Sequence, residues 1–554
     1  MKVVIVGGVA GGATAATRIR RLDEKAQIII FERSGYVSYA NCGLPYYIGE
    51  VITDFNALTL QTPKRFASRY RIDVRVQHEV LSIDVFNKRV QVKNLKTNEC
   101  FFESYDKLLL SPGAKPMTFP SMPIKDSIFT LRTIEDMVKI KKYILQHQVS
   151  SAILIGGGFI SLEMAENLRL LGIQTTVLQK DSHVLSFLDE DMASTVHLEL
   201  KKQGISLLCH ADVSSIKQND DQCQVFLSDG STFLADLVIV AIGVVPDSFL
   251  AKQAGLKLGI KESIWVNDQM ETSISNIYAV GDAVCISHFI TKQPSVIALA
   301  GPANKQARIA ADNICGIASH YQGSLGTSIL KVFDLSVGFT GLNEQMAQFY
   351  AYEYETLLLS TTHHASYYPH AQPLTLKVLY DKKTLCILGA QVIGYEGVDK
   401  KIDVLATAIQ TKMKIVDLKH LDLAYAPPYS SVKDPLNIIG YMAENIETHK
   451  VKQASFLDLA KLQNQKDILL LDVRTDYEYQ EGSIDGFLHI PLDSLREKLS
   501  LLDSSKSIYV MCHSGLRSYL ACRILMQNGF DVYNLKGGYQ YYQMLQIHQE
   551  KIVV

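Results

Sequence analysis

Residues 2–12 read KVVIVGGVAGG, a short strand rich in β-branched residues that runs directly into a glycine turn. An alanine-rich helix follows as far as about Leu22, and a second apolar strand, Gln27–Phe31, ends at Glu32. A strand, a glycine turn and a helix in this order place a pyrophosphate against backbone N–H groups at the positive end of the helix. The N-terminal segment therefore predicts a βαβ unit that binds a dinucleotide.

The same pattern occurs a second time, and two such units indicate two dinucleotides. Strand Ser151–Ile155 enters the turn GGGFIS at residues 156–161, a helix continues to about Leu171, and the next strand is Gln174–Leu178. Both glycine fingerprints are imperfect, because Val9 and Ser161 occupy positions where the consensus has glycine. The alternative for each turn is a tight strand-to-helix connection that binds no ligand.

Composition limits the class of protein and the kinds of partner. A chain of 554 residues exceeds one hydrophobic core, so three or more domains are expected. The 55 Lys and Arg nearly balance the 57 Asp and Glu, which predicts neither nucleic-acid nor membrane binding. The longest apolar stretch, Leu234–Val245, is interrupted by Asp236 and too short to span a bilayer, so we expect a buried strand.

Cysteine usage and the N-terminus favour the reducing cytoplasm. The N-terminal apolar run stops at Val6 without the longer segment of a signal peptide. The nine cysteines include no close-spaced pairs typical of a disulfide framework or a zinc site, so no metal is expected. An individual cysteine is therefore expected to matter through its reactivity.

Further segments resemble the flavin-dependent disulfide reductases. Glu32 follows Gly12 by about 20 residues, a spacing at which a carboxylate can hold a ribose diol. Residues 275–282, SNIYAVGD, resemble the strand-end box of that superfamily, whose aspartate contacts the flavin ribityl chain, and residues 108–113 and 237–243 resemble its crossover segments. The resemblance assigns FAD to the first turn. The predicted FAD-binding residues are Gly7, Gly8, Val9, Ala10, Gly11, Gly12, Glu32 and Asp282.

The second turn then receives the nicotinamide cofactor, NADPH or NADH. Phe159 stands where the family places an aromatic gate over the nicotinamide pocket. Gln179 and Lys180 replace the acid typical of NAD selectivity, so NADPH should be tolerated, although Lys180 as a solvated surface lysine is the alternative. The predicted residues are Gly156, Gly158, Phe159, Ile160, Gln179 and Lys180.

Cys42 lies in SYANCGLPYY, residues 38–47, after the first βαβ unit, where the superfamily brings its redox sulfur to the flavin. No second cysteine follows closely, since the next is Cys100. Cys42 is therefore predicted to cycle through a mixed disulfide with a small thiol or through a sulfenic acid. Peroxidase-type relatives carry a histidine in the first glycine turn, and Ala10 at that position argues against peroxide chemistry.

These features closely resemble the coenzyme A-disulfide reductases that carry a C-terminal rhodanese domain, also called CoA persulfide reductases. The resemblance implies an α/β protein with Rossmann-like FAD and NAD(P) domains, an α+β dimerisation domain and an α/β rhodanese domain. The expected boundaries are 1–120 with 244–323 for the FAD-binding domain, 121–243 for the NAD(P)-binding domain, 324–446 for the dimerisation domain, 447–454 for a linker and 455–554 for the rhodanese-like domain.

The resemblance also implies CoA-binding residues. Thr14, Arg18 and Arg21 lie on one face of the first helix, where they could grip the ADP phosphates, although a solvated helix face is the alternative. Arg71 departs from the lysine of relatives and could replace it. The full set is Thr14, Arg18, Arg21, Ser38, Asn41, Arg71, Asn304 and Lys433.

Two tyrosines, Tyr367 and Tyr425, resemble a pair that family members supply to the active site from the opposite subunit, which implies a homodimer. Phenols beside a sulfur–sulfur bond can donate to the leaving thiolate. Ordinary interface tyrosines are the alternative.

A second sulfur site is expected near the C-terminus. Residues 512–518, CHSGLRS, follow a strand at Ser507–Met511 and open a helix at Gly515–Asn528. This placement points backbone N–H groups at the Cys512 sulfur, and Arg517 adds positive charge, both of which favour an anionic persulfide. The loop from Cys512 to Arg517 is shorter than a cysteine phosphatase needs, and an inactive rhodanese fold is the remaining alternative.

The predicted activity is reduction of a CoA disulfide or CoA persulfide by NAD(P)H, through FAD and a mixed disulfide between Cys42 and CoA, while Cys512 handles sulfane sulfur. One alternative is an NADH oxidase that uses a Cys42 sulfenic acid. Another is a redox-sensing or sulfur-storage flavoprotein with negligible turnover, which an intact hydride-donor site argues against.

Overall fold

The computed structural model describes residues 1–119, 127–218, 222–463 and 465–549. These residues form two compact units, and each is described by itself. The first contains Met1–Leu185 and Gly204–Gly326, and the second contains Ser186–Gln203 and the described residues from Thr327 to Gln549. Residues 186–203 lie inside the predicted NAD(P)-binding domain by sequence but cluster with the second unit. The predicted boundary at 120/121 and the chain end at 550–554 lie outside the described residues.

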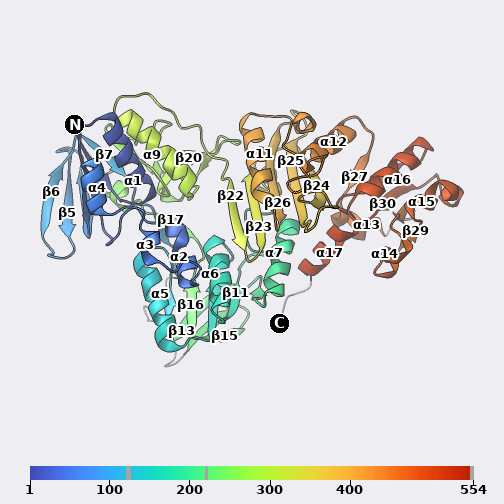
Figure 1. The fold of residues 1–554 in the computed structure, drawn as a ribbon, viewed down its shortest axis with the longest axis horizontal. Coiled ribbons are helices and arrows are strands. Elements are labelled where there is room, and N and C mark those ends of the chain that lie inside the picture. Colours follow the sequence, from blue (N-terminus) through green and yellow to red (C-terminus); the bar gives the residue numbers. More distant parts are fainter. Residues whose placement is uncertain (120–126, 219–221, 464, 550–554) are drawn as a thin grey trace. The chain divides into compact units, whose positions relative to one another are not determined.

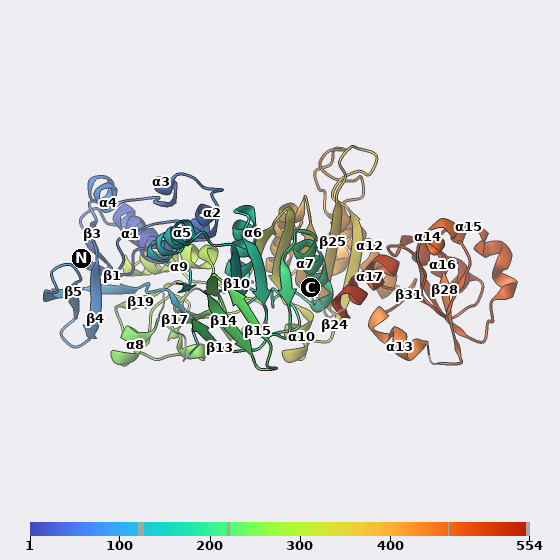
Figure 2. The same ribbon diagram turned by 90° about the horizontal axis from the view of Figure 1, so that it is seen from below.

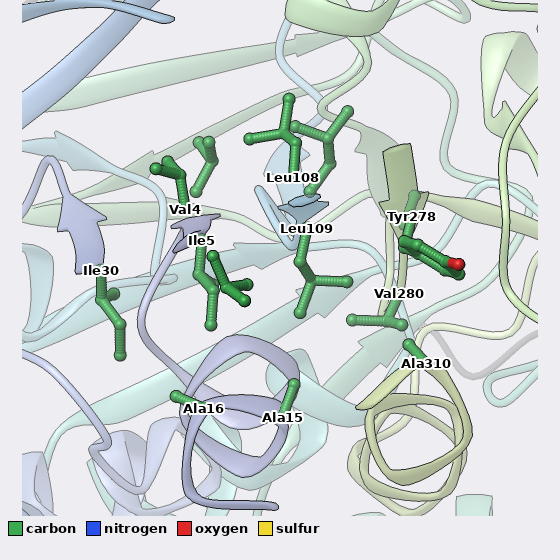
Figure 3. Packing of buried hydrophobic residues seen from close by; sticks show 14 of the residues in the cluster. Val4, Ile5, Ala15, Ala16, Ile30, Leu108, Leu109, Tyr278, Val280 and Ala310 are labelled. Atoms are coloured by element: carbon green, nitrogen blue, oxygen red, sulfur yellow. The ribbon is translucent and has the colours of Figure 1, made fainter. Parts of the chain in front are cut away.

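The first unit begins with a five-stranded parallel sheet in the order β19-β7-β1-β2-β3 (Figure 1). Its strands are β1 (Lys2–Val6), β2 (Gln27–Glu32), β3 (Asp73–Val76), β7 (Lys107–Leu110) and β19 (Ile277–Ala279). Helices α1 (Ala10–Leu22) and α9 (Ala300–Ile314) pack on each other. Figure 3 shows Ala15 and Ala16 of α1 against the side chains of the sheet, where small residues allow close approach.

A second parallel sheet in the same unit has the order β12-β11-β10-β16-β9. It contains β9 (Ile128–Phe129), β10 (Ser151–Ile155), β11 (Gln174–Leu178), β12 (Ser206–Leu208) and β16 (Leu237–Val240), with α5 (Ile134–His147) and α6 (Phe159–Leu170). The chain crosses between the two sheets through the antiparallel pair β8 (Ala114–Pro116) and β17 (Val244–Pro246). Both predicted βαβ units are therefore confirmed.

Smaller elements complete the first unit. They are α2 (Leu44–Ile48), α3 (Phe55–Leu58), α4 (Pro63–Tyr70), α8 (Phe249–Gln253), β4 (His78–Asp84), β5 (Arg89–Asn94), β6 (Cys100–Ser104), β13 (Val213–Gln218), β14 (Cys223–Leu227), β15 (Thr232–Ala235), β18 (Ile264–Trp265), β20 (Val284–Ser287) and β21 (Pro294–Ser295).

The prediction of one buried strand over Leu234–Val245 is wrong. This stretch contributes to β15, β16 and β17, and only β16 is fully buried, since Leu234 is 57% and Val245 41% exposed. The break is at Asp236, whose carboxylate accepts hydrogen bonds from the backbone N–H groups and hydroxyls of Ser150 and Ser151. A polar anchor at this position separates the strands before and after it.

The second unit contains an antiparallel sheet in the order β22-β23-β26-β25-β24. Its elements are β22 (Ser328–Val332), β23 (Leu335–Gly341), β24 (Tyr354–Thr362), β25 (Pro373–Asp381), β26 (Ile387–Gly394), α10 (Glu344–Phe349), α11 (Val398–Gln410) and α12 (Pro435–Glu447). Helix α7 (Glu190–Lys202) also belongs to this unit.

The C-terminal part of the second unit is a parallel sheet in the order β27-β31-β30-β28-β29 (Figure 2). It comprises β27 (Lys452–Ala454), β28 (Ile468–Asp472), β29 (Phe487–His489), β30 (Ser507–Met511), β31 (Val532–Leu535), α13 (Leu459–Leu462), α14 (Asp476–Gln480), α15 (Leu492–Leu495), α16 (Leu516–Gln527) and α17 (Gly538–Gln549). Part of the predicted linker 447–454 is structured, because β27 pairs with β31. Helix α17 packs on α7 (Figure 1).

Candidate active site

The first glycine turn borders a pocket at the carboxyl ends of β1 and β2. The pocket is lined by residues that include Gly7, Glu32, Ser111 and Arg132. Gly7 has φ of +94°, and a Cβ there would lie 2.1 Å from the Ser111 carbonyl oxygen, so glycine is required. The first turn of α1 has no acidic residue. The start of α1 has no side-chain cap, and uncapped main-chain donors at a helix start of this kind fit the pyrophosphate of a dinucleotide.

Of the two predicted carboxylates, Glu32 lines this pocket and Asp282 contacts Arg132, another lining residue. Glu32 is buried, and its oxygens accept hydrogen bonds from the N–H groups of Gly8 and Ser34, both at 2.8 Å, so it also braces the turn. Asp282 forms an ion pair with Arg132 at 2.5 Å. Sequence reasoning missed Arg132, which lies in no recognised motif and reaches Asp282 only through the fold.

The second glycine turn has the same construction. Gly156 has φ of +108°, and a Cβ there would lie 2.4 Å from the Ala241 carbonyl oxygen. At Gly158 a Cβ would meet no atom within 4 Å, so this side of the turn is open to a ligand. Phe159 and Ile160 begin α6 and are partly exposed. At the end of β11, Gln179 is buried.

Cys42 lies in a 3-10 turn, Asn41–Gly43, just before α2. Its thiol is exposed and donates to the Asn41 side-chain oxygen at 3.9 Å. Desolvation is the largest cause that raises the pKa of Cys42 above its usual value, the charge of Glu163 raises it further, and Arg132 opposes both. The surrounding protein groups therefore favour the thiol over the thiolate.

Glu163 and Tyr46 were not predicted. Glu163 is on α6, and the Tyr46 hydroxyl donates to its carboxylate at 3.5 Å. Desolvation raises the pKa of Glu163 to about 7. A carboxyl group with this pKa can exchange a proton near neutral pH. No sequence signal marks it, because a glutamate in an amphipathic helix is commonplace.

The fold brings several predicted CoA-binding residues of the first unit together. The Thr14 hydroxyl on α1 donates to the Asn304 side chain on α9 at 2.6 Å. Arg18 forms an ion pair with Asp312 at 2.8 Å, and Arg21 is exposed one turn further along the helix. Asn41 adjoins Cys42 directly.

Two other residues of the predicted set have structural roles in the first unit. Ser38 has φ of +49°, and its N–H donates to the Gly8 carbonyl oxygen, which ties the Cys42 loop to the first turn. Arg71 caps α4 with φ of +50°, and its exposed guanidinium lies 3.6 Å from Glu24. Lys433 is exposed and belongs to the second unit.

Tyr367 and Tyr425, both exposed, meet in the second unit, where their hydroxyl oxygens are 3.2 Å apart. A buried polar cluster of Ser430, Asp434 and Lys401 anchors the segment that follows Tyr425. The Ser430 hydroxyl donates to Asp434 at 2.7 Å, and Lys401 forms an ion pair with the same carboxylate.

Cys512 begins the loop that joins β30 to α16, and it is buried, with 1% exposure. Its sulfur accepts hydrogen bonds from the Gly515 N–H at 3.1 Å and from the Ser518 hydroxyl at 3.3 Å, so one backbone N–H and one side chain donate to it, and the predicted role of successive backbone N–H groups stays a prediction. Arg517 binds Glu478 through two contacts of 2.6 Å, and this interaction lowers the pKa of Glu478 to about 2. The charge of Arg517 is thus shared with a carboxylate that sequence reasoning missed.

Residues 1–307 match the family model for pyridine nucleotide-disulphide oxidoreductases, and residues 327–435 match the dimerisation domain of that family. The chain belongs to the pyridine nucleotide-disulphide oxidoreductases. Residues 455–545 match the family model for the rhodanese-like domain, so this oxidoreductase also contains a rhodanese-like domain. The predicted fold class and family resemblance are confirmed.

Individual relatives of this oxidoreductase share most of its length. The coenzyme A disulfide reductase of Staphylococcus aureus strain JH9 is 39% identical over 447 residues, which cover 80% of this chain and all of the relative. The crystal structure of reduced Bacillus anthracis CoADR-RHD is 44% identical with a TM-score of 0.96, covering 100% of this chain and 99% of that one. An NAD-dependent persulfide reductase from A. fulgidus is 36% identical with a TM-score of 0.92, covering 98% and 100%.

A family of this kind implies FAD and a nicotinamide nucleotide, and the two glycine turns fit them. Among the described residues, no group of His, Cys, Asp and Glu is arranged to hold a metal ion. Within the same residues, no helix combines the length and apolarity that crossing a membrane requires.

Proposed function

We propose that this oxidoreductase reduces CoA disulfide or CoA persulfide with NAD(P)H, through a mixed disulfide between Cys42 and CoA. The observation that carries the proposal is the isolation of Cys42 beside the first dinucleotide turn. The next cysteine in the chain is Cys100 and Cys42 forms no disulfide bond, which supports a partner sulfur supplied by a small thiol. Similarity to the S. aureus coenzyme A disulfide reductase supports CoA as that partner.

The proposed binding site for the ADP part of CoA consists of Thr14, Arg18, Arg21 and Asn304. The hydrogen bond from Thr14 to Asn304 fixes α1 against α9 and places polar groups at the exposed edge of both helices. Arg21 is exposed, whereas Arg18 is oriented by Asp312. Guanidinium groups in this arrangement suit bidentate contacts with phosphate.

The proposed reaction needs no second cysteine from the protein. The Cys42 thiolate attacks a sulfur of CoA disulfide, which forms the mixed disulfide and releases CoA thiolate; with CoA persulfide the leaving group is hydrosulfide. FAD, when bound at the first turn, supplies the two electrons that NAD(P)H provides to cleave the mixed disulfide. Cys42 is then a thiolate again and CoA leaves as a thiol. Glu163 is placed to exchange a proton near this loop.

Tyr367 and Tyr425 are proposed to stabilise the leaving thiolate in the active site of the opposite subunit of a homodimer. Their hydroxyls form one donor pair on an exposed surface. The match to the family's dimerisation domain supports this arrangement. Cys512 is proposed to carry sulfane sulfur, because its sulfur faces two donors that would stabilise an anionic persulfide.

Intact mass measurement of the purified protein, with and without reductant, tests the proposal. We expect an adduct with the mass of CoA on Cys42 that disappears with reductant and in Cys42→Ser. Steady-state thiol release from CoA disulfide and sulfide release from CoA persulfide should both be NAD(P)H-dependent. Oxygen uptake that exceeds thiol release would favour an NADH oxidase, and negligible turnover would favour a redox sensor; either result overturns the proposal.

A further inference from the structure

In a βαβ unit the residues that follow the second strand lie beside the adenosine ribose of the bound nucleotide, and after β11 these are Gln179 and Lys180. The side-chain nitrogen of Gln179 lies 3.1 Å from a carboxylate oxygen of Asp181 and 3.1 Å from the His183 carbonyl oxygen. Both neighbours are acceptors, so they determine the orientation of the amide. Its two hydrogens are used within the protein, and Gln179 can offer a ribose the carbonyl oxygen.

An acceptor at this place distinguishes the two nucleotides. A ribose 2′-hydroxyl can donate a hydrogen bond to the Gln179 oxygen, whereas a 2′-phosphate presents acceptor oxygens and negative charge. Gln179 also lies close to the turn, since a Cβ on Gly157 would be 3.1 Å from the Gln179 oxygen. Gln179 therefore favours the diol.

Lys180, the cation expected to bind a 2′-phosphate, already forms an ion pair within the protein. The Lys180 amine forms an ion pair with Asp212 at 3.0 Å. Asp212 also accepts a hydrogen bond from the Ser228 hydroxyl at 2.9 Å. These two hydrogen bonds lower the pKa of Asp212, so the carboxylate is ionised throughout the physiological range.

The Lys180 ammonium is thus paired with the carboxylate of Asp212, and Asp181 places a further carboxylate beside Gln179. We propose that Asp212 is a specificity-determining residue that makes the second dinucleotide site prefer NADH over NADPH, by holding Lys180 and by placing negative charge where a 2′-phosphate would bind. This inference rests on the proposed function only in that the second turn takes a nicotinamide nucleotide. Because the Lys180–Asp212 pair is exposed, with side-chain exposures of 73% and 51%, single substitutions can redirect Lys180 without disturbing the core.

The test is calorimetric titration of the FAD-loaded protein with NAD⁺ and NADP⁺. We expect the wild type to bind NAD⁺ more tightly. Asp212→Asn should lower the Kd for NADP⁺ by about fivefold or more while the Kd for NAD⁺ changes by less than about twofold, as removal of one charge near a phosphate predicts. The kcat/KM ratio for NADPH over NADH should rise in parallel.

Two further variants identify the cause. Ser228→Ala removes a hydrogen bond to Asp212 without changing charge and should leave the NADP⁺/NAD⁺ ratio near that of the wild type. Adding Lys180→Met to Asp212→Asn should cancel most of the gain in NADP⁺ affinity, because Lys180 is then absent. Tighter NADP⁺ than NAD⁺ binding by the wild type, or an unchanged ratio in Asp212→Asn, would overturn the inference. Failure of both nucleotides to bind would instead contradict the proposed function.

Discussion

The hydroxyl oxygens of Tyr367 and Tyr425 lie 3.2 Å apart although 58 residues separate them in the chain. The Ala365 N–H donates to the Ser430 carbonyl oxygen at 3.2 Å, which joins the two tyrosine-bearing segments through their backbones. Ser430, in the second of these segments, is in turn bound by Asp434, which also binds the buried Lys401. The hydrogen bond shared by the two tyrosines raises the pKa of Tyr425 above its usual value, so the Tyr425 phenol keeps its proton at neutral pH.

We predict that replacing both Tyr367 and Tyr425 with Phe slows CoA disulfide reduction by about tenfold or more, because the leaving thiolate loses its donors. Steady-state kinetics measure the effect, and flavin absorbance checks that FAD content is unchanged. In verified heterodimers of a Cys42→Ser subunit with a double-Phe subunit, one site regains Cys42 and both tyrosines, so activity should partly return. Heterodimers without any recovery would contradict sites shared between subunits.

The reactivity of Cys42 should respond in opposite directions to two neighbours. The charge of Glu163 raises the pKa of Cys42 and that of Arg132 lowers it. At neutral pH, Glu163→Gln should therefore increase the thiolate fraction and the alkylation rate of Cys42 by about threefold, and Arg132→Gln should decrease it. Peptide mass spectrometry after timed iodoacetamide treatment measures the rate at this site. Changes of the same sign in both variants would mean that charge is not the cause.

Gly7→Ala should destabilise the FAD-binding sheet by about 3 kcal/mol and reduce the flavin content of the purified protein, since a methyl group there meets the Ser111 carbonyl oxygen and the positive φ adds strain. Gly158→Ala is the matched comparison, because its methyl group meets no protein atom within 4 Å. Urea unfolding followed by flavin fluorescence reports both. Equal stability losses would show that steric contact with Ser111 is not decisive.

Cys42 and Cys512 should have separable functions. Electrons from FAD reach only a sulfur beside the flavin, whereas sulfur transfer requires direct sulfur contact. Cys42→Ser should abolish NAD(P)H-dependent reduction of every sulfur substrate and leave thiosulfate sulfurtransferase activity intact. Cys512→Ser should abolish that transfer and leave reduction of free CoA disulfide. Loss of CoA disulfide reduction in a folded, FAD-replete Cys512→Ser protein would contradict the prediction that the two cysteines act at separate sites.

Much of this molecule was predictable from local sequence. The strands Lys2–Val6 and Ser151–Ile155 and the helix that begins at Ala10 follow from glycine turns and apolar runs that act over a few residues, whereas the role predicted for Cys42 rests on a family resemblance. The prediction of one strand over Leu234–Val245 was wrong, because apolarity does not reveal that Asp236 binds Ser150 and Ser151. This contact divides the stretch into separate strands.

The sequence by itself determined the two glycine turns that open α1 and α6 and the strand-to-helix loop that contains Cys512, since each depends on residues that are adjacent in the chain. Only the tertiary structure decided that Glu163 contacts Tyr46, that Arg517 binds Glu478, and that Lys180 is held by Asp212. Charged side chains act over a few ångströms of space and not over sequence, so their partners, and with them the electrostatics of each site, appear only when distant segments pack together.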